Sequence, residues 1–345
     1  SKDIAAAPHS SPVLQAFKAL REIYPAHSIA ATQGNILGFP GLLYSPLADA
    51  PLVSHTMFIP IARSGGGVKG ALLDSIQFGA FTVAWDSYDF IVYVVNYPIG
   101  LGTTTTHIVL HEGPVEPARS LILNAGKWSQ ELHEEIWVYN QGYWQKDPAL
   151  WTSVQKASWD AIIMKDEFKK AIQKDVYGFF KSEAVYKDLG VAWKRGLIMH
   201  GPPGNGKSIT IKAIIKTCDA LGFAPLYVKS FQNWAGEEAA MQDVFDKARQ
   251  FSPCVIILED LDALINDGNR SFFLNQVDGL QSNDGLLIIG TTNHFDRLDP
   301  GLSTRPSRFD RKYLFDDPDN EERALYAKYW QNKLRKNQEI EFPDA

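Results

Sequence analysis

The stretch Gly201-Pro-Pro-Gly-Asn-Gly-Lys-Ser208 constrains the fold of this chain more than any other, because it matches the phosphate-binding pattern G-x-x-x-x-G-K-[ST] without a gap. Its glycines let successive backbone N–H groups point into one concavity that phosphate oxygens can approach closely. Lys207 adds a positive charge near the β and γ phosphates, and Ser208 offers a hydroxyl to Mg²⁺. The pattern therefore predicts a site for a nucleoside triphosphate.

The pattern requires a strand before the loop and a helix after it, and the flanking residues predict both. Residues 195–200 read as a short buried strand, and residues 209–221 carry apolar side chains at helical spacing until Gly222. A helix that begins at the loop aims its positive end at the phosphates. We therefore assign nucleotide binding to the loop and the start of the helix, namely Gly201, Pro202, Pro203, Gly204, Asn205, Gly206, Lys207, Ser208 and Ile209.

Charge and cysteine content indicate which partners and which cellular compartment to expect. A net charge of -6 offers no attraction to nucleic acid, so no such partner is expected. The two cysteines, Cys218 and Cys254, fit neither a zinc site nor a disulfide framework, which favours core thiols in a reducing, intracellular compartment. No membrane span is expected, because no apolar run reaches about 18 residues. The chain starts at Ser1, so we expect that an upstream segment could have been removed.

Changes of pattern divide the 345 residues into four segments. Residues 1–54 mix prolines with one expected helix and are interpreted as a peripheral arm. Residues 55–150 are rich in expected strands and are interpreted as an α+β domain for substrate recognition or localisation. In residues 151–317 strands alternate with helices, and because these strands are apolar on both faces we expect a parallel sheet covered by helices on both sides. Residues 318–345 hold the start of a helical segment.

Two carboxylates follow the apolar strand 255–258, whose end lies beside the phosphate loop if the sheet is parallel. One of them can hold Mg²⁺ through water while its neighbour accepts the proton of an attacking water. We assign the general base to Asp260 and the magnesium, shared with Ser208, to Glu259; the reverse assignment is the alternative. A further apolar strand ends at Asn293, whose amide can orient the water.

At this point the chain resembles the AAA family of ATPases. The family places in the same order a phosphate loop, an acidic strand end, a strand ending in Thr-Asn, and a segment like residues 298–310, Leu-Asp-Pro-Gly-Leu-Ser-Thr-Arg-Pro-Ser-Arg-Phe-Asp. The resemblance covers about residues 159–335 and implies a P-loop NTPase module with ATP and Mg²⁺ as cofactors. It implies that Asn293 is a sensor and that Arg305 and Arg308 are arginine fingers for a neighbouring subunit. Such fingers imply a homo-oligomeric ring, of six subunits or alternatively seven.

Three departures from the family pattern refine this resemblance. The order Glu259-Asp260 reverses the usual Asp-Glu and is similar to the subfamily of the mitochondrial translocase for the Rieske iron–sulfur protein, as are residues 159–163 and 186–198. Trp234 takes the place of the pore-loop aromatic of AAA unfoldases, where it could grip a threaded polypeptide; an ordinary surface or core tryptophan is the alternative. The helical lid of the family is mostly absent from residues 318–345, so we expect a fragment or a divergent protein.

Together these features predict a Mg²⁺-dependent ATPase that assembles into a ring and remodels, unfolds or translocates a protein partner. The alternative is a nucleotide-gated assembly scaffold with negligible turnover. A third hypothesis, an ATPase stimulated by nucleic acid, is disfavoured by the acidic charge balance. The reducing compartment expected from the cysteines is equally consistent with cytoplasm, nucleus and mitochondrion.

Overall fold

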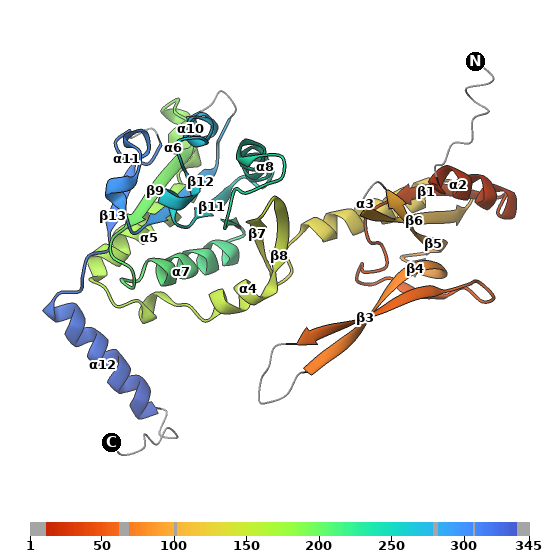
Figure 1. The fold of residues 1–345 in the computed structure, drawn as a ribbon, viewed down its shortest axis with the longest axis horizontal. Helices are drawn as coiled ribbons and strands as arrows, with labels where there is room; N and C mark the ends of the chain where they lie inside the picture. The colour runs from red at the N-terminus through yellow and green to blue at the C-terminus, as the bar shows by residue number, and fades with distance from the viewer. Residues whose placement is uncertain (1–11, 62–68, 100–101, 279–281, 306–307, 337–345) are drawn as a thin grey trace. The chain divides into compact units, whose positions relative to one another are not determined.

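The computed structural model divides the chain into two compact units, Ser1–Glu131 and Leu132–Ala345. It describes residues 12–61, 69–99, 102–278, 282–305 and 308–336 (Figure 1).

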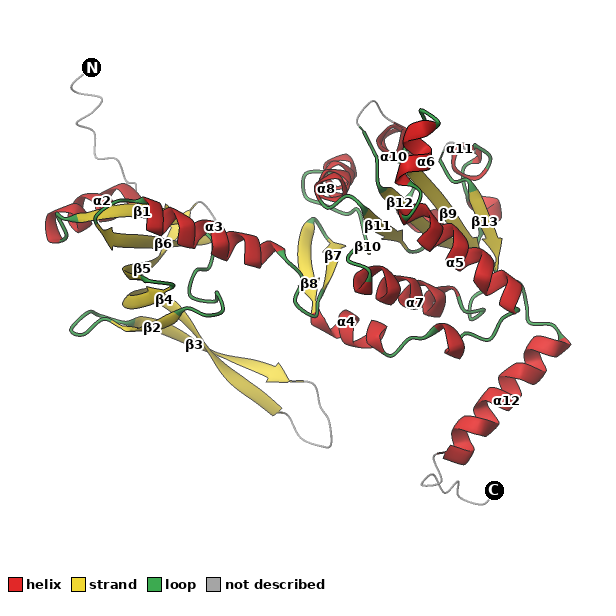
Figure 2. Ribbon diagram, turned by 180° about the vertical axis from the view of Figure 1, so that it is seen from behind, coloured by secondary structure: helices red, strands yellow, loops and turns green. Residues whose placement is uncertain are grey.

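The N-terminal unit is built on a six-stranded antiparallel sheet (Figure 2). Its strands are β1 (His27–Thr32), β2 (Leu43–Pro46), β3 (Val53–Ile61), β4 (Lys69–Trp85), β5 (Tyr88–Ile99) and β6 (Gly102–Glu112), in the order β1-β6-β5-β4-β2 with β3 paired to β4. Alternation along β5 sends Val92 toward helix α3 (Glu116–Gln130) and Tyr93 toward α2 (Pro12–Ile23), so the two helices cover opposite faces.

The predicted arm, residues 1–54, differs from what the structure shows. Its strand β1 pairs with β6 and its strand β2 pairs with β4, while Leu20 of α2 is buried against Ile108 and Leu110. These strands are short, β1 is mostly half-buried and β2 is exposed, so their sequences lack the apolar runs by which strands are recognised. Strands β1 and β2 of this segment are thus integral parts of the N-terminal sheet.

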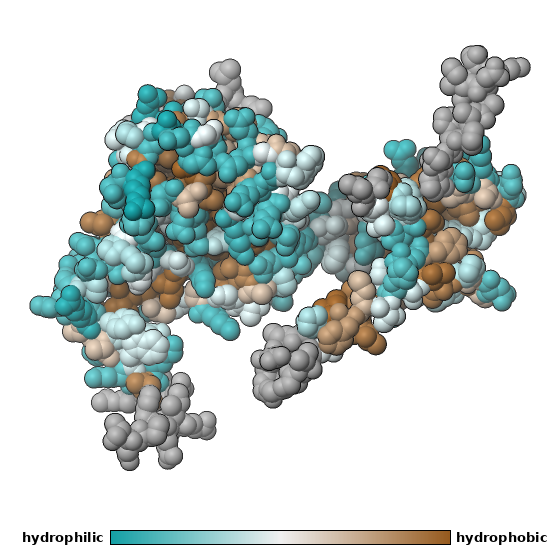
Figure 3. Space-filling view, viewed as in Figure 1, coloured by the Kyte–Doolittle hydropathy of each residue, from teal (hydrophilic) through white to brown (hydrophobic). Residues whose placement is uncertain are grey.

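The N-terminal half of β4 pairs with β3 alone and forms a two-stranded ribbon. Large apolar side chains are exposed on both of its strands, namely Met57, Phe58, Ile59, Leu72 and Leu73. Figure 3 shows this ribbon as a brown patch. The N-terminal unit therefore carries an apolar surface outside its own core.

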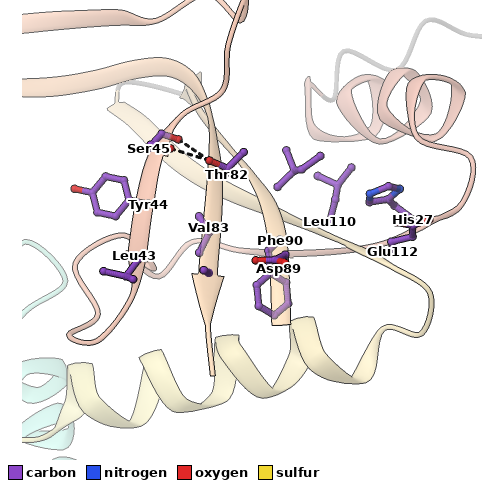
Figure 4. Close-up of a pocket in the computed structure, with 12 residues that line it drawn as sticks. His27, Leu43, Tyr44, Ser45, Thr82, Val83, Asp89, Phe90, Leu110 and Glu112 are labelled. Atoms are coloured by element: carbon purple, nitrogen blue, oxygen red, sulfur yellow. Dashed lines mark hydrogen bonds between the residues drawn. The ribbon is translucent and has the colours of Figure 1, made fainter. Parts of the chain in front are cut away.

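A shallow hollow of about 590 Å³ lies against the same sheet, lined by residues of β1, β2, β4, β5 and β6 (Figure 4). At its margin the hydroxyls of Ser45 and Thr82 are 2.9 Å apart and join β2 to β4. None of the residues predicted for the nucleotide site lines this hollow.

The C-terminal unit contains a seven-stranded sheet in the order β13-β9-β12-β11-β10-β7-β8. Its strands are β7 (Ile136–Asn140), β8 (Tyr143–Asp147), β9 (Lys194–His200), β10 (Ala224–Val228), β11 (Cys254–Leu258), β12 (Leu286–Thr292) and β13 (Arg311–Leu314). Neighbouring strands are parallel except for the antiparallel pair β7 and β8. The predicted α/β fold with a parallel sheet is confirmed.

Helices cover both faces of this sheet because its strands are apolar on both sides. Along β11, Val255 and Ile257 pack toward α4 (Pro148–Gln155), α5 (Asp166–Phe180) and α7 (Lys207–Ala220). The alternate residues pack toward α8 (Glu237–Gln250), α9 (Leu261–Leu264), α10 (Arg270–Asp278) and α11 (Pro300–Ser303). The unit also contains α6 (Glu183–Asp188) and α12 (Asn320–Lys336).

Two smaller observations bear on the expectations from composition. Cys218 and Cys254 are buried and unpaired, which confirms that both thiols are core residues. Among the helices of the described residues, none is both long and apolar enough to cross a membrane.

The boundary between the units differs from the predicted one at residue 150. The structure divides the chain after Glu131, because β7 pairs with β10 and extends the parallel sheet by the β7–β8 hairpin. Gln141 and Gly142 have φ of 49° and 86°, as a tight turn between antiparallel strands requires. Sequence shows that β7 is an apolar strand but not which sheet it joins.

Candidate nucleotide-binding site

The phosphate loop connects β9 to α7, as the flanking sequence predicted. Gly201 and Gly206 have φ of 138° and 94°, backbone conformations that favour glycine. A side chain is also excluded by close packing, since a Cβ atom on Gly201 would lie 2.1 Å from the carbonyl oxygen of Phe315. The loop can therefore keep its shape only with glycines at these places.

Lys207 begins helix α7 and is held against the loop. Its side chain is only 8% exposed, and Nζ donates hydrogen bonds to the carbonyl oxygens of Gly201 at 2.7 Å and Pro202 at 2.8 Å. Burial lowers the pKa of this ammonium, and the negative charge of Asp260 opposes the shift. No side chain caps the start of α7, so its first backbone N–H groups are available to a ligand. Together with the ammonium of Lys207 and the exposed hydroxyl of Ser208, they form a place where an anion can bind.

Asn205 ties the loop to the segment that precedes α12. Its Nδ2 donates to the carbonyl oxygen of Phe315 at 3.3 Å and to Oδ1 of Asp317 at 3.1 Å. Pro202, Pro203 and Gly204 are exposed at the tip of the loop. Of the predicted loop residues, Asn205 is thus the one with a side-chain bond to the polypeptide beyond β13.

The two acidic residues follow β11 and are held from different strands, Glu259 through its carboxylate and Asp260 through its backbone. The phenol of Tyr227 on β10 donates a hydrogen bond to Oε2 of Glu259. Asp260 has φ of 55°, and its backbone N–H donates to Oγ1 of Thr291 on β12 at 3.1 Å. The left-handed backbone at Asp260 ends strand β11. The carboxylate of Glu259 is thus bonded to β10, whereas the backbone of Asp260 is bonded to β12.

Polar residues at the end of β12 complete this edge of the sheet. The hydroxyl of Thr292 donates to Oδ1 of Asp262 at 2.6 Å, which gives that carboxylate a structural partner. Asn293 follows directly and is exposed. Because β9, β12 and β11 are neighbours and parallel, the phosphate loop, Asn293 and the two carboxylates meet at the same edge.

The two predicted arginine fingers have different surroundings. Arg305 follows α11 and is exposed. Arg308 is 9% exposed, and its guanidinium donates to Oδ2 of Asp278 at 2.5 Å and to the carbonyl oxygen of Gly301 at 2.7 Å. The structure therefore commits Arg308 to contacts within its own chain and leaves Arg305 accessible.

Trp234 lies in the loop after β10, outside the cluster of strand ends. Its side chain is 89% exposed, which excludes a core role in this chain. The turn that presents it is braced by Asn233, whose Oδ1 accepts from the N–H of Ala235 at 3.0 Å. This exposure is what both a pore-loop aromatic and an ordinary surface tryptophan require.

Comparison with known proteins gives the family of this region. The family model described as "ATPase family associated with various cellular activities (AAA)" matches residues 197–317. Residues 197–317 form an AAA domain. The match includes the phosphate loop, both carboxylates, Asn293 and both arginines, so the family supports ATP binding and ATPase activity in general.

A curated relative of the AAA domain is a protein from Plasmodium falciparum (isolate 3D7) named "Putative cell division cycle ATPase". The two are 28% identical over 203 residues, which cover 55% of this chain and 16% of the relative. The chain thus matches only a small part of that protein's length.

Two partners at the site escaped prediction. Tyr227 lies in an apolar strand, and no sequence pattern marks its phenol as part of a site. Thr291 was considered only as one of the polar residues at the end of β12. Their pairing with Glu259 and Asp260 depends on the order of β10, β11 and β12 in the sheet.

Proposed function

We propose that the AAA domain binds Mg-ATP and hydrolyses it. The observation that carries this proposal is the meeting of the phosphate loop, two carboxylates and Asn293 at one edge of the parallel sheet. Lys207 and the N–H groups of the loop bind the phosphates, and Ser208 and Glu259 hold Mg²⁺, the latter through water. Asp260 takes the proton of the attacking water, and Asn293 orients that water.

We further propose that the chain assembles into a homo-oligomeric ring in which Arg305 reaches the nucleotide of a neighbouring subunit. The exposure of Arg305 supports this, and the internal contacts of Arg308 favour a structural role for the second arginine. The order Glu259-Asp260 supports the likeness to the Rieske-protein translocase subfamily. The ring would remodel, unfold or translocate a protein partner in a reducing compartment, with the N-terminal unit serving recognition or localisation.

The test is ATP turnover as a function of protein concentration, with light-scattering mass measured in parallel with and without a slowly hydrolysed ATP analogue. A rate per subunit that rises as a nucleotide-dependent assembly forms is the expected result, since the finger comes from a neighbour. Tight binding without turnover in a fully assembled ring would instead favour the scaffold hypothesis.

We expect Trp234→Ala to retain ATP hydrolysis but to lose work on the protein partner. The side chain is exposed and outside the cluster of strand ends, so the chemistry does not need it. The measurement compares ATPase rate with unfolding of a model polypeptide. Trp330→Ala, which removes a 42% exposed tryptophan on α12, is the matched control. If Trp234→Ala unfolded the model polypeptide as fast as the unmodified chain does, Trp234 would be an ordinary surface residue.

A further inference from the structure

Among the described residues, Tyr227 is the one that forms a hydrogen bond with the side chain of Glu259. Strand β10 is parallel to β11, with Tyr227 opposite Ile257. Because side chains alternate along a strand, Glu259, two residues after Ile257, continues the same face of the sheet, where the Tyr227 phenol donates to its Oε2. Among the described residues no hydrogen bond joins Oε1, the other oxygen of this carboxylate.

This face of the sheet is the one that the phosphate-loop helix covers. Tyr227 packs against the core cluster that contains Ile257 and residues of α7 such as Ile211. Ser208 lies in the first turn of that helix. The hydroxyl proposed for Mg²⁺ and the Glu259 carboxylate are therefore on the same side of the sheet, while Asp260 is anchored separately to β12 through Thr291.

The phenol is suited to be a permanent donor. A tyrosine phenol has an ordinary pKa of about 10, so the hydroxyl is protonated at physiological pH. It donates to the charged carboxylate of Glu259, a bond stronger than one between neutral groups. Phenylalanine would fill nearly the same space, so packing alone does not require the hydroxyl.

We propose that Tyr227 is a positioning residue for magnesium: its phenol holds Oε2 of Glu259 so that Oε1 faces the water shell of the ion. This inference rests on the proposed function and names the group that sets its metal requirement. Mg²⁺ demands near-octahedral geometry and keeps several waters, so a carboxylate that acts through water must be held in one orientation. Loss of such outer partners typically costs about 10- to 100-fold in metal affinity or activity.

The experiment is a Mg²⁺ titration of ATP turnover for the full chain and for Tyr227→Phe, with binding of a fluorescent ATP analogue measured separately in EDTA. We expect the Mg²⁺ concentration for half-maximal turnover to rise at least about 10-fold. Nucleotide affinity without metal should stay unchanged, and excess Mg²⁺ should recover most of the rate. A Mg²⁺ dependence equal to that of the unmodified chain would overturn the inference.

A matched control separates positioning from general loss of structure. Tyr313 likewise donates its phenol to a carboxylate, Oδ2 of Asp175 at 2.5 Å, but on β13. Tyr313→Phe should leave the Mg²⁺ dependence unchanged, and an equal shift in both variants would show a nonspecific effect and contradict the proposal.

A double-variant cycle tests whether Tyr227 acts through Glu259. In a Glu259→Gln background, Tyr227→Phe should cause no further shift, because the two residues act as one unit. Additive shifts would contradict the inference. A different outcome is that the unmodified chain binds nucleotide equally well with and without Mg²⁺ and does not hydrolyse it. That result would refute the proposed function and this inference with it.

Discussion

Arg305→Ala is expected to lower the maximal rate of ATP hydrolysis by about 10³-fold or more while leaving ATP affinity near that of the unmodified chain. An arginine supplied across a subunit boundary stabilises charge that develops in the transition state, so its loss affects the rate and not ground-state binding. The exposed position of Arg305 after α11 makes this contribution to a neighbour possible. Single-turnover hydrolysis and analogue binding measure the two quantities separately.

Mixing tests whether Arg305 acts across subunits. Asp260→Asn removes the proposed base but keeps the arginine, so a mixed ring contains some sites with both groups intact. Part of the turnover should return on mixing with Arg305→Ala. No return of activity at concentrations where rings form would count against action in trans.

Arg308→Ala is the matched comparison for the arginine prediction. It removes the bonds to Asp278 and Gly301, so we expect a loss of about 2 kcal/mol in the free energy of unfolding. Thermal unfolding of the two variants distinguishes the structural arginine from the accessible one.

The second large effect is expected for Lys207→Ala, which should weaken ATP binding by about 100-fold or more. The variant removes a buried ammonium that belongs to the loop and sits at the start of α7. A charge-assisted hydrogen bond to phosphate contributes about 1.5–3 kcal/mol, and the loop also loses the group that its carbonyl oxygens of Gly201 and Pro202 surround. Binding of a fluorescent ATP analogue measures the change.

Lys212→Ala is the control on the same helix. Its Nζ donates to Oγ of Ser153 on α4 at 3.0 Å, away from the phosphate loop. This variant should bind ATP as the unmodified chain does. Affinity of Lys207→Ala close to that of Lys212→Ala would contradict the phosphate-loop assignment.

Most secondary structure of the C-terminal unit was predictable because its signals are local. Apolar runs of strand length at β9, β11 and β12, and helical spacing after Ser208, are read from consecutive residues. The phosphate loop was equally local, since its glycines and Lys207 act through backbone conformations and a contact six residues apart.

Contacts distant in sequence were not predictable in the same way. The partner of Glu259 is 32 residues away, the partner of Asp260 is 31 away, and Arg308 is 30 residues from Asp278. The order of the motifs predicted both arginines as arginine fingers. Only the structure shows that Arg308 is buried and bonded to Asp278 of its own chain. The assignment of β7 to the second unit likewise required strand pairing.

The sequence by itself determined the nucleotide loop, the parallel α/β class and the residues at the ends of the strands, because these depend on short-range pattern and backbone chemistry. Only the tertiary structure decided that β7 and β8 extend the seven-stranded sheet of the C-terminal unit. It also decided that Arg305 and not Arg308 is accessible, and that the phenol of Tyr227 donates a hydrogen bond to Glu259. The physical reason is strand order: it brings together side chains that sequence keeps apart, and nothing in the neighbouring residues encodes it.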